Sequence, residues 1–260
     1  MGNNIKRVLV TNDDGIDAPG LVSAVKIAKQ FCDDVWVFAP AEEKSGASHS
    51  ISLAHPMRLI ERGEKEFALT GSPADCVMVA TRSMLTDQLP DLVISGVNFG
   101  QNIAEDVTYS GTVAGAKEGT VMGIRSVALS QALSFGGPEV AEPNFKISEK
   151  YAAQVIEKSL ALDWPAGMLM NINFPDIALS DACDVRVTAQ GRRDKMILQL
   201  EERRDPRNKP YYWYDFTHQI STPTPGTDLE AIMQGDISIT PLQMNNTHDG
   251  MKLELETLFE

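Results

Sequence analysis

Cysteine, histidine and long apolar runs are scarce in this chain of 260 residues. The three cysteines are odd in number and far apart, so neither a disulfide framework nor a cysteine zinc site is expected. The four histidines form no HxH or HExxH pair, which argues against a histidine zinc site. No apolar run approaches the roughly 20 residues of a membrane-spanning helix, and the first residues lack the apolar core of a secretory signal. Together these absences predict a cytoplasmic protein.

Basic residues are also fewer than acidic ones: the chain has 23 lysines and arginines and 36 aspartates and glutamates, which gives a formal net charge of −13. An acidic surface repels other polyanions, so we expect neither nucleic-acid polymers nor membranes as partners. A small phosphorylated substrate stays possible because a bound cation can invert the local field. Two common nucleotide-binding motifs are absent: there is no GxxxxGK[ST], and the first turn lacks GxGxxG.

What the sequence does contain is an alternation of apolar strands and helical segments over its first 130 residues. The expected strands are 8–10, 34–40, 57–60, 66–69, 91–95 and 126–129, and the expected helices are 18–31, 72–85 and 110–122. This βαβ rhythm predicts an α/β fold with a doubly wound, mostly parallel sheet of the Rossmann-like kind. A helix at 147–162 and strands at 168–172 and 235–242 continue it less regularly.

The run from Gln190 to Gly226 is polar, rich in proline and locally aromatic, notably at Tyr211–Tyr214. A structureless run of that length is unusual inside a compact domain. Two readings are open: an arm that packs on another subunit, or a cover over the active site. Tyrosine and tryptophan are both common at interfaces.

The most informative short segment is Asn12–Gly15, which follows the apolar strand Val8–Val10 directly. In open α/β sheets, ligands bind at the carboxyl ends of the strands. Two adjacent acids, Asp13 and Asp14, disfavour each other's ionisation, and a divalent cation relieves that cost. Carboxylate and amide oxygens suit Mg²⁺, Mn²⁺ or Ca²⁺. The alternative is ordinary turn chemistry, in which aspartate and asparagine are frequent.

Three loops that follow predicted strands carry oxygen donors, and a parallel sheet brings such loops to one edge. Their candidate residues are Asn12, Asp13 and Asp14; Ser45, Ser48, His49 and Ser50; and Asn98, Asn102, Asp106, Ser110 and Thr112. The predicted helix that starts at Ser110–Thr112 offers backbone N–H groups to an anion, although Ser110 is equally suited to be a simple N-cap. His49 is either a general acid or base, or a residue that orients its loop. A cation beside a helix start suggests a metal-assisted phosphomonoesterase.

The same motifs closely resemble the stationary-phase survival protein SurE family of nucleotidases. The matching segments follow the family order and span nearly the whole chain: Val8–Gly15 (VLVTNDDG), Ala39–Ser50 (APAEEKSGASHS), Gly71–Val77 (GSPADCV), Asp91–Asn102 (DLVISGVNFGQN), Tyr109–Val113 (YSGTV), Asn171–Pro175 (NINFP), Gly226–Ala231 (GTDLEA) and Ser238–Leu242 (SITPL). The combination of NDDG with SGxNxGxN and YSGTV is specific.

The resemblance implies a three-layer α/β/α fold, with a catalytic domain over residues 1–185 and an extended segment over 186–260 that serves oligomerisation. It also implies hydrolysis of nucleoside 5′- and 3′-monophosphates, with short polyphosphate as a further substrate, by a homodimer or homotetramer. One Mg²⁺ or Mn²⁺ per subunit is expected. The implied metal ligands are Asp13, Asp14, Ser45 and Asn98; the implied catalytic residues are Asp13, Asp14 and Asn98; the implied phosphate or substrate contacts are Asn12, Ser110, Gly111 and Thr112.

In the expected mechanism one of the two aspartates, with Asp14 favoured, accepts a proton from the attacking water. Two alternatives stay open at this point. A covalent aspartyl-phosphate route uses a similar carboxylate, but such enzymes usually show DxDx[TV] and the acids here are adjacent. A non-catalytic nucleotide-sensing module has the same fold, because fold alone does not decide function.

Overall fold

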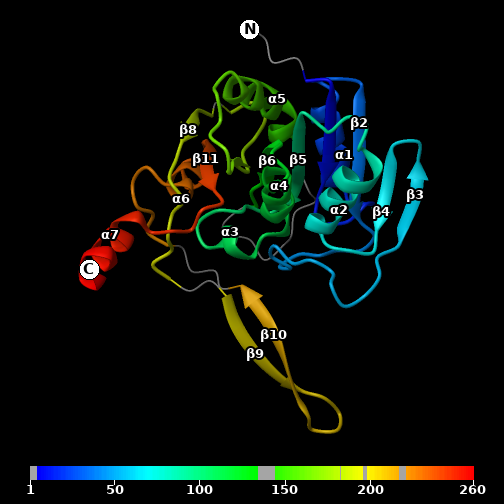
Figure 1. The fold of residues 1–260 in the computed structure, drawn as a ribbon. Coiled ribbons are helices and arrows are strands. Elements are labelled where there is room, and N and C mark those ends of the chain that lie inside the picture. Colours follow the sequence, from blue (N-terminus) through cyan, green and yellow to red (C-terminus); the bar gives the residue numbers. More distant parts are fainter. Residues whose placement is uncertain (1–4, 134–143, 182, 196–197, 217–220) are drawn as a thin grey trace.

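The structure is a computed structural model that describes residues 5–133, 144–181, 183–195, 198–216 and 221–260. Within them a nine-stranded sheet, in the order β3-β4-β2-β1-β5-β6-β7-β11-β8, forms the centre (Figure 1). Its strands are β1 (Arg7–Thr11), β2 (Asp34–Pro40), β3 (Leu59–Gly63), β4 (Glu66–Leu69), β5 (Leu92–Phe99), β6 (Arg125–Gln131), β7 (Met168–Phe174), β8 (Val185–Val187) and β11 (Ile237–Gln243). The six strands from β4 to β7 in this order run parallel, so the predicted mostly parallel α/β sheet is confirmed.

Helices cover both faces of the sheet and make three layers. On one face α1 (Pro19–Ala28) packs beside α5 (Lys146–Leu160), and on the other α2 (Pro73–Val79) packs beside α4 (Gly111–Val121). Successive residues of the apolar run Val8–Val10 in β1 point to opposite faces of the sheet. Val8 and Val10 join the core on the α1 side, and Leu9 joins the core on the α2 side. A strand buried on both faces needs apolar residues at every position.

The start of α2 forms as its sequence predicts. Ser72 is the N-cap, its side chain accepts the Asp75 N–H, and the Asp75 carboxylate accepts the Ser72 N–H in return. This is a capping box, with Pro73 at the first helical position. The helix then continues into a π-helical turn, η1 (Ala80–Met84), so the predicted segment 72–85 consists of two joined helices.

The run 190–226 is more ordered than its composition suggests. It contains β9 (Leu198–Arg204) and β10 (Pro210–Phe216), which pair antiparallel as a hairpin that projects away from the sheet (Figure 1). The carboxylate of Asp205 accepts the N–H groups of Arg207 and Lys209 and so closes the turn. Tyr211 to Tyr214 are between 40% and 72% exposed in the single chain.

The last part of the chain returns to the sheet. After α6 (Asp228–Met233), strand β11 pairs antiparallel with β7 and parallel with β8. A final helix, α7 (Asp249–Phe259), lies at the periphery with every residue exposed (Figure 1). This helix is not among the elements that the sequence pattern predicts. The division into a catalytic domain to residue 185 and an oligomerisation segment stays a prediction. Among the described residues, no helix has both the length and the apolarity needed to span a membrane.

Candidate active site

The two adjacent acids lie at the carboxyl end of β1, beside the end of β5 and the start of α4. Asp13 is almost fully buried, at 4% exposure, and its Oδ1 accepts a hydrogen bond from the Thr112 hydroxyl. Gly111 packs directly on this carboxylate, because a Cβ at Gly111 would lie only 2.7 Å from the Cβ and Oδ2 of Asp13. Any side chain at position 111 would therefore displace Asp13, so the glycine allows the helix start to approach it.

The helix start has the expected cap. Ser110 is the N-cap of α4 and its Oγ accepts the Val113 N–H at 3.0 Å. The Ser110 hydroxyl hydrogen is not used in that bond and can still be donated to a ligand. A buried carboxylate at a helix N-terminus is favoured by the helix dipole. The site thus pairs an acid with a helix end that attracts anions.

Asp14 lies on the other side of Asp13, toward β5. Its Oδ2 accepts the Phe99 N–H at 3.3 Å. Burial, followed by the charge of Asp13, raises the pKa of Asp14 to about 7. Burial likewise raises the pKa of Asp13, although the hydrogen bond from Thr112 opposes it. Two adjacent carboxylates with raised pKa values indicate a place where the protein alone does not stabilise the ionised forms.

The loop between β2 and β3 brings Ser45 to the same edge. The Lys44 N–H donates to the Asp13 backbone oxygen at 2.7 Å, and the Ser45 hydroxyl donates to Glu43 Oε1 at 2.9 Å. The charge of Glu43 adds to the raised pKa of both aspartates. Glu43 was not among the predicted site residues, and its position two residues before Ser45, a candidate ligand, was the signal that would have found it.

Strand β5 is irregular just before Asn98, whose place among the metal ligands stays a prediction. The register between β5 and β6 shifts between Ser95 and Asn98, and Gly96 has a φ of +135° with no room for a Cβ beside the Leu129 oxygen. Such a bulge re-aims the side chains that follow it. The Asn98 Nδ2 donates to the Gly100 oxygen at 2.8 Å, so the amide oxygen is the atom left for a ligand.

Two other predicted donors of this loop have partners elsewhere in the fold. The Nδ2 of Asn102 donates to the Ser130 Oγ, and Asp106 forms an ion pair with Arg193, so both side chains have structural partners. These contacts give both side chains a structural role, and the expectation that they join Asn98 stays a prediction. His49 also has a partner: its Nε2 lies 3.0 Å from Oε2 of the buried Glu118, as expected for a residue that orients its loop.

The donor set fits a hard divalent cation. It combines two carboxylates with hydroxyl and amide oxygens, which is the low carboxylate count that Mg²⁺ accepts when waters complete its shell. Asn12 supports this fit, because its Oδ1 is buried without a hydrogen-bond partner while its Nδ2 donates to the Gly15 oxygen. In the part of the chain that the structure describes, no group of three or more His, Cys, Asp or Glu side chains is arranged to hold a metal ion.

A cavity of about 420 Å³ opens beside Asp14 at the carboxyl ends of β1, β2 and β5. Its walls include the aromatic rings of Phe99 and Phe145 and the acids Asp17, Glu42 and Glu43. A ligand group of modest size can therefore sit against Asp14 without any rearrangement of the sheet.

Comparisons with known proteins agree with this fold. Residues 8–196 match the family model described as Survival protein SurE. A protein of Parvibaculum lavamentivorans named 5′-nucleotidase SurE is 51% identical over 95% of this chain and 88% of its own length. One of the same name from Azorhizobium caulinodans is 48% identical over 98% of this chain and 99% of its own. The crystal structure of Sure protein from Aquifex aeolicus superposes with a TM-score of 0.82 at 32% identity, covering 98% of this chain and 100% of that one.

Proposed function

Since the chain belongs to the SurE survival protein family, we propose that it is a metal-dependent phosphomonoesterase that hydrolyses nucleoside 5′- and 3′-monophosphates to nucleoside and phosphate. Short-chain polyphosphate is a further proposed substrate. The relatives' printed name supports the 5′ activity. The observation that carries the proposal is the contact between the Asp13 carboxylate and the start of α4, because it sets a cation ligand and an anion-binding element side by side.

In this proposal Asp13, Asp14, Ser45 and Asn98 hold one Mg²⁺ or Mn²⁺ per subunit. The bound cation would neutralise the paired carboxylates and polarise the phosphoryl oxygens. The chain's own contribution is to fix these donors before substrate arrives: Thr112 orients Asp13, the Phe99 N–H orients Asp14, and the Gly100 oxygen orients the amide of Asn98.

The phosphoryl group would lie at the start of α4. Ser110 and Gly111 offer it a hydroxyl and a closely approaching backbone. Asn12 is assigned to the substrate as an acceptor from a protonated group or a bound water, because its buried Oδ1 is an acceptor and its Nδ2 donates to the Gly15 oxygen. Thr112 donates its hydroxyl hydrogen to Asp13, so we assign it a supporting role beside the phosphate contacts. Donors fixed at a helix start stabilise charge on the equatorial oxygens of the transferring group without having to reorient.

Asp14 is the group we assign to accept a proton from the attacking water. Asp14 borders the cavity, and one of its oxygens accepts the Phe99 N–H, which leaves the other oxygen for that proton. Asp13 suits this role less because it is almost fully buried and Gly111 packs directly on its carboxylate, whereas Asp14 lines the cavity. The cavity beside Asp14 would then hold the nucleoside side of the substrate.

Phosphate release from AMP and 3′-AMP with added Mn²⁺ tests this function. We expect release from both esters, loss of release on addition of a chelator, and loss of release in Asp13→Asn. If phosphate were released equally well from phosphomonoesters that are not nucleotides, the protein would be a general phosphatase. Nucleotide binding without phosphate release would favour a sensing module, and a trapped phospho-aspartate would favour the covalent route.

The assembly and the location also belong to the proposal. A homodimer or homotetramer built through residues 186–260 is supported by the exposed aromatic side chains of the β9–β10 hairpin and by the exposed apolar residues of α7. Large exposed apolar patches usually mark interaction sites. Light scattering of the purified protein tests the oligomeric state. The proposed cytoplasmic location, and the proposed absence of nucleic-acid or membrane partners, rest on composition alone.

A further inference from the structure

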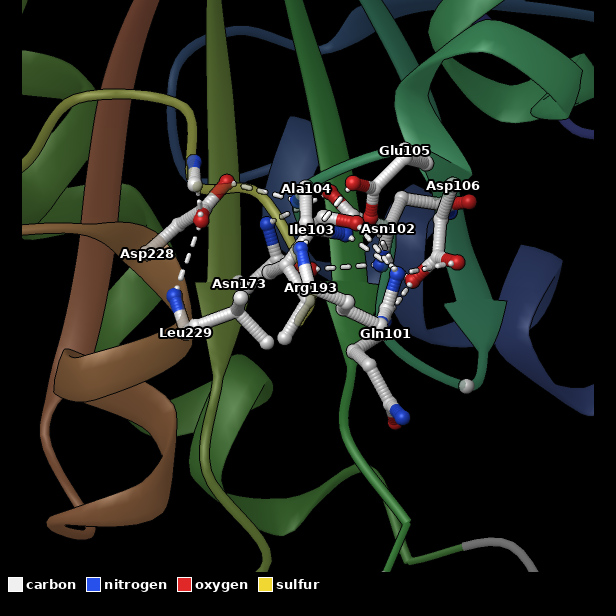
Figure 2. A network of polar contacts seen from close by, with 12 residues as sticks. Gln101, Asn102, Ile103, Ala104, Glu105, Asp106, Asn173, Arg193, Asp228 and Leu229 are labelled. Carbon is white, nitrogen blue, oxygen red and sulfur yellow. Dashed lines mark hydrogen bonds and ion pairs between the residues drawn. The ribbon is translucent and has the colours of Figure 1, made fainter. Parts of the chain in front are cut away.

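Two motifs of this chain, Asn171–Pro175 and Gly226–Ala231, have no part in the mechanism above. The structure brings both against Gln101–Asp106, the segment between Asn98 and the start of α4 (Figure 2). Asn173 Oδ1 accepts the Asn102 N–H at 2.8 Å. Asp228, at the first position of α6, accepts the Ala104 N–H at 3.0 Å.

Ala104 is the strained point of this segment. Its φ of +50° is in the left-handed region, which residues other than glycine rarely adopt. Both of its backbone polar groups are held from the carboxy-terminal part of the chain, because Asp228 accepts the N–H and the Gln190 Nε2 donates to the oxygen at 2.8 Å. Strain of this kind persists only where the surroundings determine it, and it clusters at functional sites.

Arg193 holds the next two residues of the segment. Its guanidinium group, with a side chain only 7% exposed, donates to both oxygens of Asp106 at 2.9 and 2.6 Å. It also contacts Glu105 at 3.3 Å, and its backbone N–H donates to the same carboxylate at 2.9 Å. Figure 2 shows Arg193 directed at Glu105 and Asp106, while Asp228 lies near Ala104 at the other end of the group. The bidentate geometry is one that lysine cannot reproduce.

The held segment leads directly to the site. Asp106 begins α3 (Asp106–Tyr109), and the next residue, Ser110, is the N-cap of α4. The backbone oxygens of Thr108 and Tyr109 accept hydrogen bonds from the hydroxyl and the N–H of Ser48. The loop that carries Ser45 and the helix start that contacts Asp13 are therefore both fastened to α3.

From this chain of contacts we infer that Arg193 and Asp228 are positioning residues for the phosphomonoester site, acting through Gln101–Asp106 and α3 on the start of α4. The inference rests on the proposed function and deepens it, since it makes the segment beyond residue 185 part of the machinery that places the phosphoryl group. Neither residue touches substrate in this assignment. Their role is to hold Gly111 and Ser110 where an anion would meet them.

The test compares Arg193→Gln with Arg192→Gln, its exposed neighbour, which loses the same charge. We expect Arg193→Gln to lower kcat/KM for AMP by about ten- to a hundredfold. Inhibition by inorganic phosphate should weaken by at least about fivefold. The Mn²⁺ dissociation constant should change by less than this, because Asp13 and Asp14 follow β1 and only the Ser45 loop is fastened to α3. Arg192→Gln should match the parent in all three measurements.

A second readout does not depend on activity. Hydrogen exchange measured by mass spectrometry should become faster in Arg193→Gln over Gln101–Thr112 and over Lys44–Ser48, with the remaining sheet unchanged. If Arg193→Gln does not fold, Arg193→Lys and Asp228→Asn replace it. Asp228→Asn is expected to lose the Ala104 contact while it keeps one acceptor oxygen, and Asp249→Asn at the start of α7 is its matched control.

A folded variant with parental phosphate inhibition and parental exchange would overturn the inference. So would an activity loss that only follows the unfolded fraction. Failure of the proposed function looks different: the parent protein itself would release no phosphate from nucleotides, while the exchange comparison would still report whether Arg193 orders the segment.

Discussion

The two ends of the central strands treat their carboxylates in opposite ways. At the amino ends of β1 and β2, Asp34 accepts hydrogen bonds from Arg7 at 2.6 Å and from Lys65 at 2.8 Å. Burial alone would raise the pKa of Asp34, but these two partners outweigh it and lower the pKa. At the carboxyl end of β1, the charges near Asp13 and Asp14 belong to other acids, and both pKa values are raised.

The difference separates stability from function on one sheet. An acid with basic partners stabilises the fold, while an acid held among other acids disfavours its own ionised form until a cation binds. The fold therefore tolerates buried acids without basic partners at the carboxyl edge of the sheet and pairs its acid with basic residues at the amino edge. A change at one edge should leave the other edge unaffected.

Replacing Asp13 should have the largest effect. Asp13→Asn removes the carboxylate that contacts both the proposed cation and the start of α4, so we expect nucleotide hydrolysis to fall by a factor on the order of a thousand or more. Stability without metal should not fall, because the variant removes a buried acid whose pKa is raised. Phosphate release and thermal unfolding measure the two effects, and turnover near the parental value would refute the assignment.

The pH dependence of metal binding should be the next largest effect. Asp14, with a pKa of about 7, must lose its proton to bind a cation. Affinity for Mn²⁺ should therefore rise by about tenfold from about pH 6 to about pH 8 and then level off. Calorimetric titration at several pH values measures it. Asp14→Asn should bind weakly at every pH, and a flat profile in the parent would contradict the role of this carboxylate.

The same pKa gives a signed stability effect in the metal-free protein. An unfolded aspartate ionises near its model value of 3.8, whereas folded Asp14 stays protonated to about pH 7. The free energy of unfolding should therefore decline as the pH rises through this window and stay level above it. Thermal unfolding of the parent and of Asp14→Asn should diverge between these limits, with the variant the more stable at neutral pH.

Much of the fold was predictable because its signals are local. The apolar run of β1 and the capping box at Ser72 follow from neighbouring residues, and both appear where expected. The β9–β10 hairpin and α7 were missed because most of the apolar side chains that the structure describes in them are exposed. Without a buried face, an alternating or helical pattern looks like a polar loop that carries a few apolar residues.

The site was predictable only in part, for the opposite reason. Asp13 and Asp14 are adjacent in sequence, so their mutual repulsion follows from the sequence alone. The bond from Thr112 to Asp13 joins residues 99 positions apart, and no local spacing indicates which hydroxyl makes it. Asn98 and Asn102 look equivalent in sequence, yet the structure gives their amides different partners, the Gly100 oxygen for Asn98 and the Ser130 hydroxyl for Asn102.

A change at the amino end should affect stability and not activity. Asp34→Asn removes the ionic partner of Arg7 and Lys65, and we expect a loss of about 1–2 kcal/mol in the free energy of unfolding. For a chain of this size that loss lowers the Tm by about 2–8 °C. The difference from the parent should hold at neutral pH and narrow as the pH falls below about 4, since the pKa of Asp34 is lowered in the folded protein. An unchanged Tm at neutral pH would count against the pairing.

The smallest effect should come from the most exposed partner of this group. Lys65 lies 2.8 Å from Asp34 Oδ1, but its side chain is 37% exposed and solvent screens the pair. We expect Lys65→Met to lower the Tm by less than about 2 °C, and by less still in about 0.5 M salt. Phosphate release and Mn²⁺ affinity should stay at parental values. If hydrolysis changed instead, charge at the amino ends of the strands would reach the site, and the two edges would no longer be independent.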